Sequence, residues 1–198
     1  MTALPATRRK FTVEEYLLVE RAAEFRSEFV DGEIYAMAGA TDAHTTICDN
    51  LGGEVYARLK GTPCQGMSQN VKVPAGERLF AYPDYLIVCG KKLYRDLERD
   101  VLTNPQIIFE VLSPSTEHYD RATKFDLYKQ IDTLREYVLI AQDEQRVEHW
   151  LMLEDGDWKQ RVVSGTDASL ALEFVPVVIP VVDLYDRVEF PALTESQA

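Results

Sequence analysis

Hydrophobic residues recur along this chain with two periods, one typical of helices and one typical of strands. Between Ile47 and Leu59 every fourth residue is apolar, which predicts an amphipathic helix with Thr41 or Asp42 as its N-cap. The stretch from Thr12 to Glu15 has the capping-box pattern and is followed by further apolar residues. We therefore predict a second, shorter helix near the N-terminus.

Short apolar runs separated by polar turns predict strands in much of the remaining chain. The Asp31-Gly32 pair lies inside the apolar stretch from Phe29 to Met37 and predicts a β-hairpin. A third helix is expected from about His118 to Ile131, because the Ser and Thr residues before it supply candidate caps. Further strands are expected at residues 68–73, 85–89, 107–112, 136–141, 146–153 and 158–163.

This order of elements, rich in strands and with few helices, predicts an α+β fold in which helices cover the faces of a mixed sheet. At 198 residues the chain suits one domain, which we expect at residues 11–190. Residues 1–10 are expected to form a flexible N-terminus, and residues 191–198 a disordered tail.

The composition is ordinary for a globular protein, with 46% hydrophobic and 27% charged residues. No apolar run is long enough to span a bilayer, and Met1 to Lys10 lacks the apolar core of a signal peptide. We therefore expect a cytoplasmic protein with no membrane partner. The net charge of -12 argues against non-specific nucleic-acid binding, because such binding depends on Lys and Arg contacts with phosphates.

Cysteine and histidine spacing also limits the chemistry. Cys48, Cys64 and Cys89 are widely spaced, which fits neither a disulfide framework nor a CxxC metal site, so we expect reduced structural thiols. The three histidines are equally scattered, which argues against a zinc site built from His and Cys. If a metal is bound, we expect oxygen ligands.

A carboxylate lies in the middle of a strand that should be buried on both faces. Glu110 stands between Phe109 and Val111, and a buried carboxylate needs an ion-pair partner, a proton or a metal. Asp84 follows Pro83 at the start of another apolar strand. If these strands are neighbours, the two carboxylates converge, and hard oxygen ligands of this kind suit Mg²⁺ or Mn²⁺. The alternative is a strand Glu110 that faces solvent or pairs with an arginine.

A lysine on the third expected helix is the next candidate. Asp120, Lys124 and Tyr128 are spaced by four residues and share one face of that helix. Beside two carboxylates and a metal-bound water, Lys124 would orient the nucleophile and stabilise the charge that develops on a phosphate. The alternative is an exposed lysine paired with Asp120, with Tyr128 serving only in packing.

Several of these residues together resemble the Uma-type restriction endonuclease family of the PD-(D/E)XK nucleases. The resemblance is carried by RSEFVDGEIYAMAGAT at residues 26–41, His44, Pro83-Asp84, FEVLSPSTE at residues 109–117, and the Asp120, Lys124 and Tyr128 face. It spans nearly the whole chain. It implies a restriction-endonuclease-like core, in which helices flank a central mixed sheet, with an additional N-terminal hairpin and C-terminal strands.

The resemblance also implies a divalent metal and phosphodiester hydrolysis in DNA. Asp84 and Glu110 match the family's metal-binding carboxylates, and Glu28 and His44 are additional candidates for the site. One position departs from the general motif: its lysine should lie two residues after Glu110, where this chain has Leu112. Members of this group carry the lysine on the next helix, which Lys124 matches.

From these residues we expect a Mg²⁺-dependent endonuclease with Asp84, Glu110 and Lys124 as catalytic residues. DNA is the expected partner, and a homodimer is expected because duplex-cutting enzymes often act as pairs. The alternative is a catalytically weak or inactive nuclease fold that binds nucleic acid or protein, with His44 acting only as a structural or capping residue. Local positive charge along the substrate path is expected from Lys91, Lys92, Arg95, Arg99, Arg121 and Lys124.

Overall fold

A six-stranded mixed sheet forms the centre of the structure, a computed structural model that describes residues 9–37 and 39–190. Strands β7 and β8 are parallel, and the other neighbours in this sheet are antiparallel. The strands in spatial order are β10 (Trp158–Ser164), β9 (Arg146–Met152), β8 (Glu136–Ala141), β7 (Ile107–Leu112), β6 (Tyr85–Cys89) and β3 (Cys64–Ser68). The expected α+β architecture with a mixed sheet is therefore confirmed.

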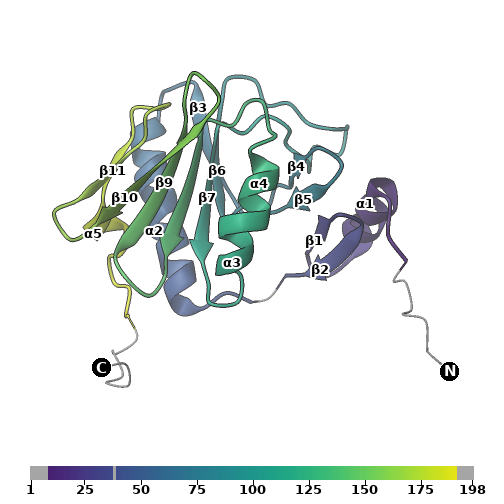
Figure 1. The fold of residues 1–198 in the computed structure, drawn as a ribbon, viewed down its shortest axis with the longest axis horizontal. Helices are drawn as coiled ribbons and strands as arrows, with labels where there is room; N and C mark the ends of the chain where they lie inside the picture. The colour runs from purple at the N-terminus through teal and green to yellow at the C-terminus, as the bar shows by residue number, and fades with distance from the viewer. Residues whose placement is uncertain (1–8, 38, 191–198) are drawn as a thin grey trace.

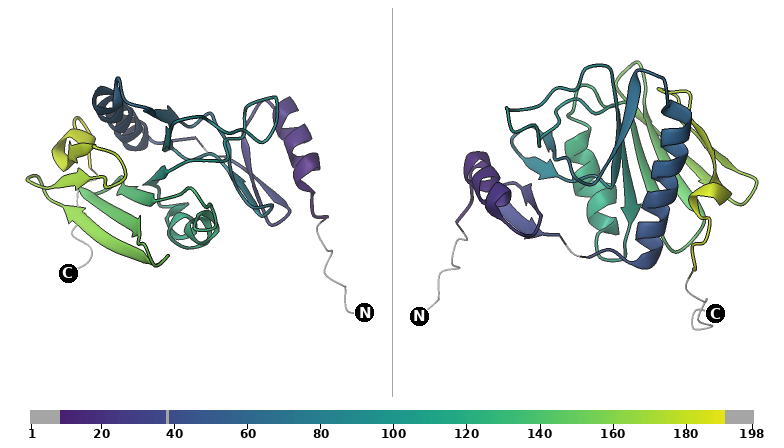
Figure 2. Two further views of the ribbon diagram at one scale, coloured as in Figure 1. Left: turned by 90° about the horizontal axis from the view of Figure 1, so that it is seen from above. Right: turned by 180° about the vertical axis from the view of Figure 1, so that it is seen from behind.

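Helices cover both faces of this sheet (Figures 1 and 2). On one face lies α2 (Asp42–Leu59), whose side chains at positions 47, 51, 55 and 59 pack against alternate residues of the central strands. The other face carries one continuous helical segment that crosses over from β7 to the parallel strand β8. Its parts are α3 (Glu117–Tyr119), the π-helical turn η1 (Asp120–Lys124) and α4 (Phe125–Tyr128). Because both faces are covered, β7 is buried along its whole length.

A smaller antiparallel sheet lies beside the large one, toward the N-terminal end of the chain (Figure 1). Asp31 and Gly32 turn its hairpin with φ values of 48° and 91°, the conformation that Asp-Gly hairpins favour. Helix α1 (Val13–Ala22) packs on this sheet and begins at the predicted capping box of Thr12 and Glu15. The strands in spatial order are β2 (Glu33–Ala36), β1 (Ser27–Val30), β5 (Leu79–Ala81) and β4 (Val73–Ala75).

The C-terminal segment adds β11 (Ser169–Ala171), β12 (Val178–Pro180) and the short helix α5 (Val181–Leu184). The two strands pair with each other, and all three elements contribute apolar side chains to the core beneath α2. Among the described residues, no helix is both long and apolar enough to cross a membrane. The predicted tail at 191–198 and most of the predicted N-terminal segment lie outside the described residues.

Some predicted elements differ from the structure. The strand expected at 68–73 is instead the end of β3 and the start of β4, separated by a break at residues 69–72. The helix expected to reach Ile131 ends at Tyr128. Strand β5 was not predicted, because its three residues carry no alternation that a periodic pattern could reveal.

The prediction of three reduced cysteines is wrong for two of them. Cys64 and Cys89 are directly opposite each other on β3 and β6 and form a disulfide, with their Cα atoms 3.9 Å apart. Close cross-strand pairs bring side chains together in this way regardless of their separation in sequence. Sequence spacing therefore could not reveal the pair. Cys48 is a free thiol, as predicted.

Candidate functional site

Glu110 lies near the carboxyl end of β7 and is 3% exposed. Its neighbours Phe109 and Val111 pack in the core beneath α2, so the alternating geometry of the strand directs Glu110 to the opposite face. There its Oε1 atom is 2.9 Å from Nζ of Lys124 in η1. The buried carboxylate anticipated from the sequence is therefore present and has a cationic partner.

Asp84 lies immediately before β6, beside Glu110. The antiparallel register pairs Tyr85 with Phe109, so β6 begins next to the point where β7 carries Glu110. The backbone N–H of Asp84 donates to Glu110 Oε2 at 3.4 Å, and the backbone N–H of Val111 donates to Asp84 Oδ2 at 2.7 Å. The Asp84 carboxylate thus accepts a hydrogen bond from the backbone of β7, which fixes its position at the start of β6.

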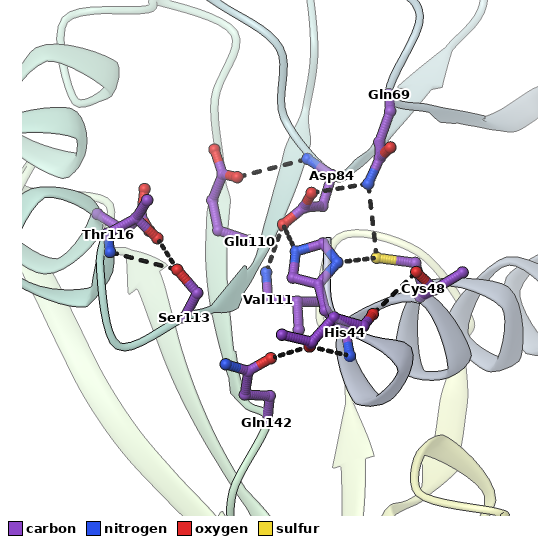
Figure 3. Close-up of polar contacts among 12 residues, drawn as sticks. His44, Cys48, Gln69, Asp84, Glu110, Val111, Ser113, Thr116 and Gln142 are labelled. Carbon is purple, nitrogen blue, oxygen red and sulfur yellow. Dashed lines mark hydrogen bonds and ion pairs between the residues drawn. The ribbon is translucent and has the colours of Figure 1, made fainter. Parts of the chain in front are cut away.

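The two carboxylates are adjacent but engage different helices. Figure 3 shows Asp84 directed toward His44 of α2, whose Nε2 atom is 3.2 Å from Asp84 Oδ2. The second oxygen of Asp84, Oδ1, accepts a hydrogen bond of 2.9 Å from the Gln69 side chain. Glu110 instead faces η1 and Lys124. The structure therefore brings the two predicted residues together. Asp84 turns toward α2 on one face of the sheet, and Glu110 turns toward η1 on the other.

Lys124 is enclosed by carboxylates rather than exposed. Its Nζ atom is 3.2 Å from Glu28 Oε1 and 3.6 Å from Asp120 Oδ1, in addition to its contact with Glu110. Burial by itself would lower the pKa of Lys124, but the charges of Glu110, Glu28 and Asp120 outweigh it and raise this pKa well above its ordinary value. The ammonium therefore stays protonated at neutral pH.

The carboxylates around Lys124 experience strong repulsion. Burial raises the pKa of Glu110 well above its ordinary value, Lys124 opposes this shift, and the charges of Asp84, Asp120 and Glu28 add to it. Burial likewise raises the pKa of Asp120. Lys124 contacts three carboxylates, and Asp84 adds a fourth negative charge near Glu110, so the cluster is short of positive charge.

Glu28 joins the site from β1 of the smaller sheet. Its Oε1 accepts a hydrogen bond from the backbone N–H of Tyr82 at 3.1 Å, which fixes the carboxylate beside Lys124. The structure thus includes the additional candidate Glu28. Glu33, on the other strand of the same hairpin, bonds to Tyr35 instead.

Among the described residues, three buried side-chain polar atoms lack a hydrogen-bond partner, and all belong to residues that interact with Lys124. They are Tyr119 Oη, Tyr128 Oη and Glu110 Oε1, of which Glu110 Oε1 has only its ion pair with Lys124. Buried polar atoms are normally satisfied, so a cluster of unsatisfied ones indicates a place for bound water or a ligand. Together with the excess of carboxylates, this observation fits a hard divalent cation and its water ligands.

His44 lies one helical turn before Cys48 on α2. Burial lowers the pKa of His44, but the hydrogen bond and charge of Asp84 outweigh burial and raise it. The other ring nitrogen, Nδ1, is 3.6 Å from Cys48 Sγ. Ligand atoms from His44, Cys48 and Asp84 all lie within 4.8 Å of one another, so these three could hold a metal ion. Sequence spacing argued against a zinc site built from His and Cys, whereas the fold brings one His and one Cys together beside Asp84.

Most of the cations expected along the substrate path lie elsewhere. The loop that carries Lys91, Lys92, Arg95 and Arg99 leaves β6 at Cys89, the opposite end of the strand from Asp84. Arg95 pairs with Glu77 and Glu14, which ties this loop to the smaller sheet and α1. Strand direction explains the error, because a residue that follows a strand in sequence is a strand's length away from the residue that precedes it.

Two expected cations and one unexpected one are closer to the site. Lys124 is within it, and Arg121 precedes Lys124 on η1 but pairs with Glu117 and Glu148. The exposed Arg26 donates to the backbone carbonyl of Gln69 at 2.8 Å, and the side chain of the same Gln69 contacts Asp84. Positive charge near the site therefore comes from fewer residues than the sequence suggested.

Comparison with known proteins assigns the chain to a family. The Uma2 family, described as "Putative restriction endonuclease", matches residues 13–181. This chain belongs to the Uma2 family. The resemblance to this family inferred from the sequence is therefore confirmed.

Similar proteins include two from Synechocystis sp. and one of known structure. Uncharacterized protein sll1609 is 31% identical over 87% of this chain and 98% of its own length. Uncharacterized protein slr1290 is 32% identical over 75% of this chain and 78% of its own length. The crystal structure of a putative nuclease belonging to DUF820 from Anabaena variabilis has a TM-score of 0.73 at 18% identity, over 88% of this chain and 97% of that one. At that identity the last comparison supports the fold.

Three residues at the site were not among the predicted catalytic or metal-binding residues: Asp120, Cys48 and Gln69. The spacing of four between Asp120 and Lys124 was visible in the sequence, and the same spacing separates His44 from Cys48 on a predicted helix. Either could have been found from helical periodicity. Gln69 lies in the irregular segment after β3, and no sequence pattern marks it.

Proposed function

We propose that this Uma2-family protein is a metal-dependent endonuclease that hydrolyses phosphodiester bonds in DNA. The observation that supports this function best is the proximity of Asp84, Glu110 and Lys124: the backbone N–H of Asp84 donates to Glu110 Oε2 at 3.4 Å, and Lys124 Nζ is 2.9 Å from Glu110 Oε1. Asp84 and Glu110 would hold Mg²⁺ or Mn²⁺. When bound, such an ion supplies an activated water and neutralises charge on the phosphate.

The roles of the protein groups follow from their environments. Lys124 acts as a fixed positive charge rather than as a proton acceptor, because its carboxylate neighbours hold its pKa high. Glu28 and Asp120 orient its ammonium group. His44 and Gln69 each bond one oxygen of Asp84, so they orient this carboxylate.

A cleavage assay tests this proposal. Purified protein is incubated with plasmid DNA and Mg²⁺ or Mn²⁺, with and without a chelator. Cleavage should require the metal, and Asp84→Asn or Glu110→Gln should each lower its rate by about 100-fold or more. Asp126→Asn is the matched control, because Asp126 is an exposed carboxylate two residues after Lys124 and pairs with Lys129.

Thermal unfolding of each variant separates lost chemistry from lost structure. Cleavage that persists in Glu110→Gln, after repurification has excluded a contaminating nuclease, would rule out this mechanism.

A second function, binding without hydrolysis, is favoured by one observation: the cations near the site are already paired with carboxylates. Lys124 is surrounded by carboxylates, Arg121 is paired, and the chain carries a net charge of -12. A nuclease fold with these features would serve as a binding module without hydrolysis. In that case the cleavage assay gives no product, and calorimetric titration with Mn²⁺ shows no heat that depends on Asp84 or Glu110.

A further inference from the structure

The free thiol of Cys48 lies beside His44, which contacts Asp84. Cys48 Sγ is 3.6 Å from His44 Nδ1, and His44 Nε2 is 3.2 Å from Asp84 Oδ2. Figure 3 shows the thiol, the imidazole and the carboxylate gathered between α2 and the start of β6. The cluster shares Asp84 with the proposed nuclease site but adds nitrogen and sulfur ligands, which Mg²⁺ does not prefer.

We propose that His44, Cys48 and Asp84 form a binding site for a thiophilic divalent ion, with Zn²⁺ as the natural candidate. Zinc is commonly bound by His nitrogen, Cys sulfur and carboxylate oxygen, and three protein ligands leave a fourth position open. This site is distinct in ligand chemistry from an all-oxygen site at Asp84 and Glu110.

The spacing of the three side chains is close to what zinc requires. With metal–ligand bonds of about 2.0 to 2.3 Å, the ligand atoms of a tetrahedral site lie roughly 3.3 to 3.8 Å apart. Ligand atoms of the three residues already lie within 4.8 Å of one another. His44 Nδ1 faces Cys48 and Nε2 faces Asp84, and only one of these nitrogens would bind the ion, so side-chain rotation has to complete the arrangement.

Gln69 supplies a second observation that favours a cation here. Its amide nitrogen lies 2.9 Å from Asp84 Oδ1 and 3.8 Å from Cys48 Sγ, so a single donor group serves the thiol and the carboxylate together. A cation between these two atoms would replace that donor. Rotation of the amide would then turn its oxygen, which carries lone pairs, toward the fourth position that the three ligands leave open.

The same three groups do not suit nucleophilic catalysis. A Cys, His and Asp arrangement acts as a nucleophilic triad only when the thiol ionises easily. Burial raises the pKa of Cys48, and the negative charges of Asp84, Glu110 and Asp49 raise it further. A divalent ion would remove this repulsion, and the thiol would release its proton to solvent on binding.

The shared carboxylate gives the site a regulatory consequence, which rests on the proposed nuclease function. Asp84 held by Zn²⁺ and His44 would no longer be available to Mg²⁺ at Glu110. Zn²⁺ should therefore inhibit Mg²⁺-dependent cleavage, and removal of Cys48 should weaken that inhibition.

Spectroscopy with Co²⁺ tests the metal site independently of any hydrolysis. Co²⁺ substitutes for Zn²⁺, and thiolate ligation produces a charge-transfer absorption in the near ultraviolet. We expect this absorption in the full-length protein, its displacement by Zn²⁺, and its loss in Cys48→Ser. Glu110→Gln should retain it, because Glu110 is outside the cluster, and His118→Gln is a control at an exposed histidine.

A second ligand variant, His44→Gln, guards against misfolding of Cys48→Ser and should weaken Co²⁺ binding at least tenfold. The Cys64–Cys89 disulfide is kept oxidised so that Cys48 is the only thiol among the described residues. The proposal is overturned if saturating Co²⁺ gives no thiolate absorption, or if that absorption persists in Cys48→Ser. Because this readout needs no cleavage, a protein without nuclease activity would still show the site, and an active nuclease without the absorption would lack it.

Discussion

The buried ammonium of Lys124 compensates the negative charge of the carboxylates around it. It is 4% exposed and faces Glu110, Glu28 and Asp120, so it is the group that makes the burial of these carboxylates tolerable. A buried carboxylate that loses its partner becomes an uncompensated charge, which costs more than the pair itself contributed. The residue is therefore structural as well as a candidate for catalysis.

Replacing this lysine should destabilise the fold in a pH-dependent way. Lys124→Met is expected to lower the free energy of unfolding by about 3 kcal/mol at pH 7, measured by urea denaturation. Carboxyl groups whose pKa is raised by folding cost stability when ionised, so part of the loss should return as Glu110 and Asp120 take up protons toward pH 5.

The double variant Lys124→Met/Glu110→Gln should be more stable than Lys124→Met. Lys129→Met is the control, since Lys129 pairs with the exposed Asp126 and its removal should change stability by less than about 0.5 kcal/mol. A loss for Lys124→Met that is equal at pH 5 and pH 7 would contradict the electrostatic explanation.

Gly66 controls the position of the ring next to Asp84. A Cβ atom at Gly66 would lie 2.1 Å from Tyr85 Oη and 2.6 Å from Cζ, which no real structure tolerates. Gly66→Ala should therefore displace the Tyr85 ring and lower the free energy of unfolding by about 1 to 3 kcal/mol. Gly53→Ala is the matched control in α2, where a Cβ meets nothing within 4 Å, and it should stabilise by about 0.5 kcal/mol or more. Equal behaviour of the two variants in thermal unfolding would refute this packing argument.

At the scale of elements, ion pairs hold α1 against the loop that follows β6. Asp100 accepts hydrogen bonds from Arg21 of α1 at 2.7 and 3.0 Å, and it lies 2.9 Å from the buried Lys72 ammonium. The Arg21 hydrogen bonds and Lys72 lower the pKa of Asp100 to about 2. This contact joins the N-terminal helix, the loop and the start of β4.

The lowered pKa of Asp100 determines how its contribution depends on pH. A carboxyl group whose folded-state pKa lies below its unfolded value contributes stability that is complete above the unfolded pKa and is lost as pH falls through the folded pKa. Asp100→Asn should therefore lower the free energy of unfolding by about 1 to 2 kcal/mol at pH 7, allowing for partial solvent screening. Below about pH 4 this difference should shrink as both proteins are titrated toward pH 2.

Asp126→Asn serves again as the exposed control for Asp100→Asn, and its effect should stay within about 0.5 kcal/mol at every pH. If the difference in free energy of unfolding between wild type and Asp100→Asn grew as pH fell, it would contradict the lowered pKa of Asp100.

At the scale of the whole molecule, each chain carries one candidate nuclease site among its described residues. One site cuts one strand, so we propose that duplex cleavage requires two copies of the chain. Plasmid linearisation should rise more steeply with protein concentration than nicking does. Mixing wild-type protein with Glu110→Gln should produce paired copies that nick the plasmid without linearising it. Linear product that forms in proportion to wild-type protein, whatever the amount of Glu110→Gln, would exclude the paired arrangement.

The family assignment and the local elements could be predicted from the sequence because the signals concerned involve neighbouring residues. Each of these signals involves residues only a few positions apart in the sequence. They are the capping box at Thr12, the Asp31-Gly32 turn and the four-residue spacing along α2, and the structure confirms all three. The hypothesis that Asp84 and Glu110 meet needed one further assumption, that their strands are neighbours, and the register of β6 and β7 confirms this adjacency.

Only the tertiary structure decided which distant residues share a site. The disulfide between Cys64 and Cys89, the contact of Gln69 with Asp84 and the displacement of the Lys91 loop from the site all follow from strand pairing and direction. These are properties of contacts between segments that are remote in sequence, and the composition of either segment alone does not contain them. The sequence by itself determined which chemistry is available, through its carboxylates, lysine and thiol, whereas the fold decided which of these groups lie within a few ångströms of one another.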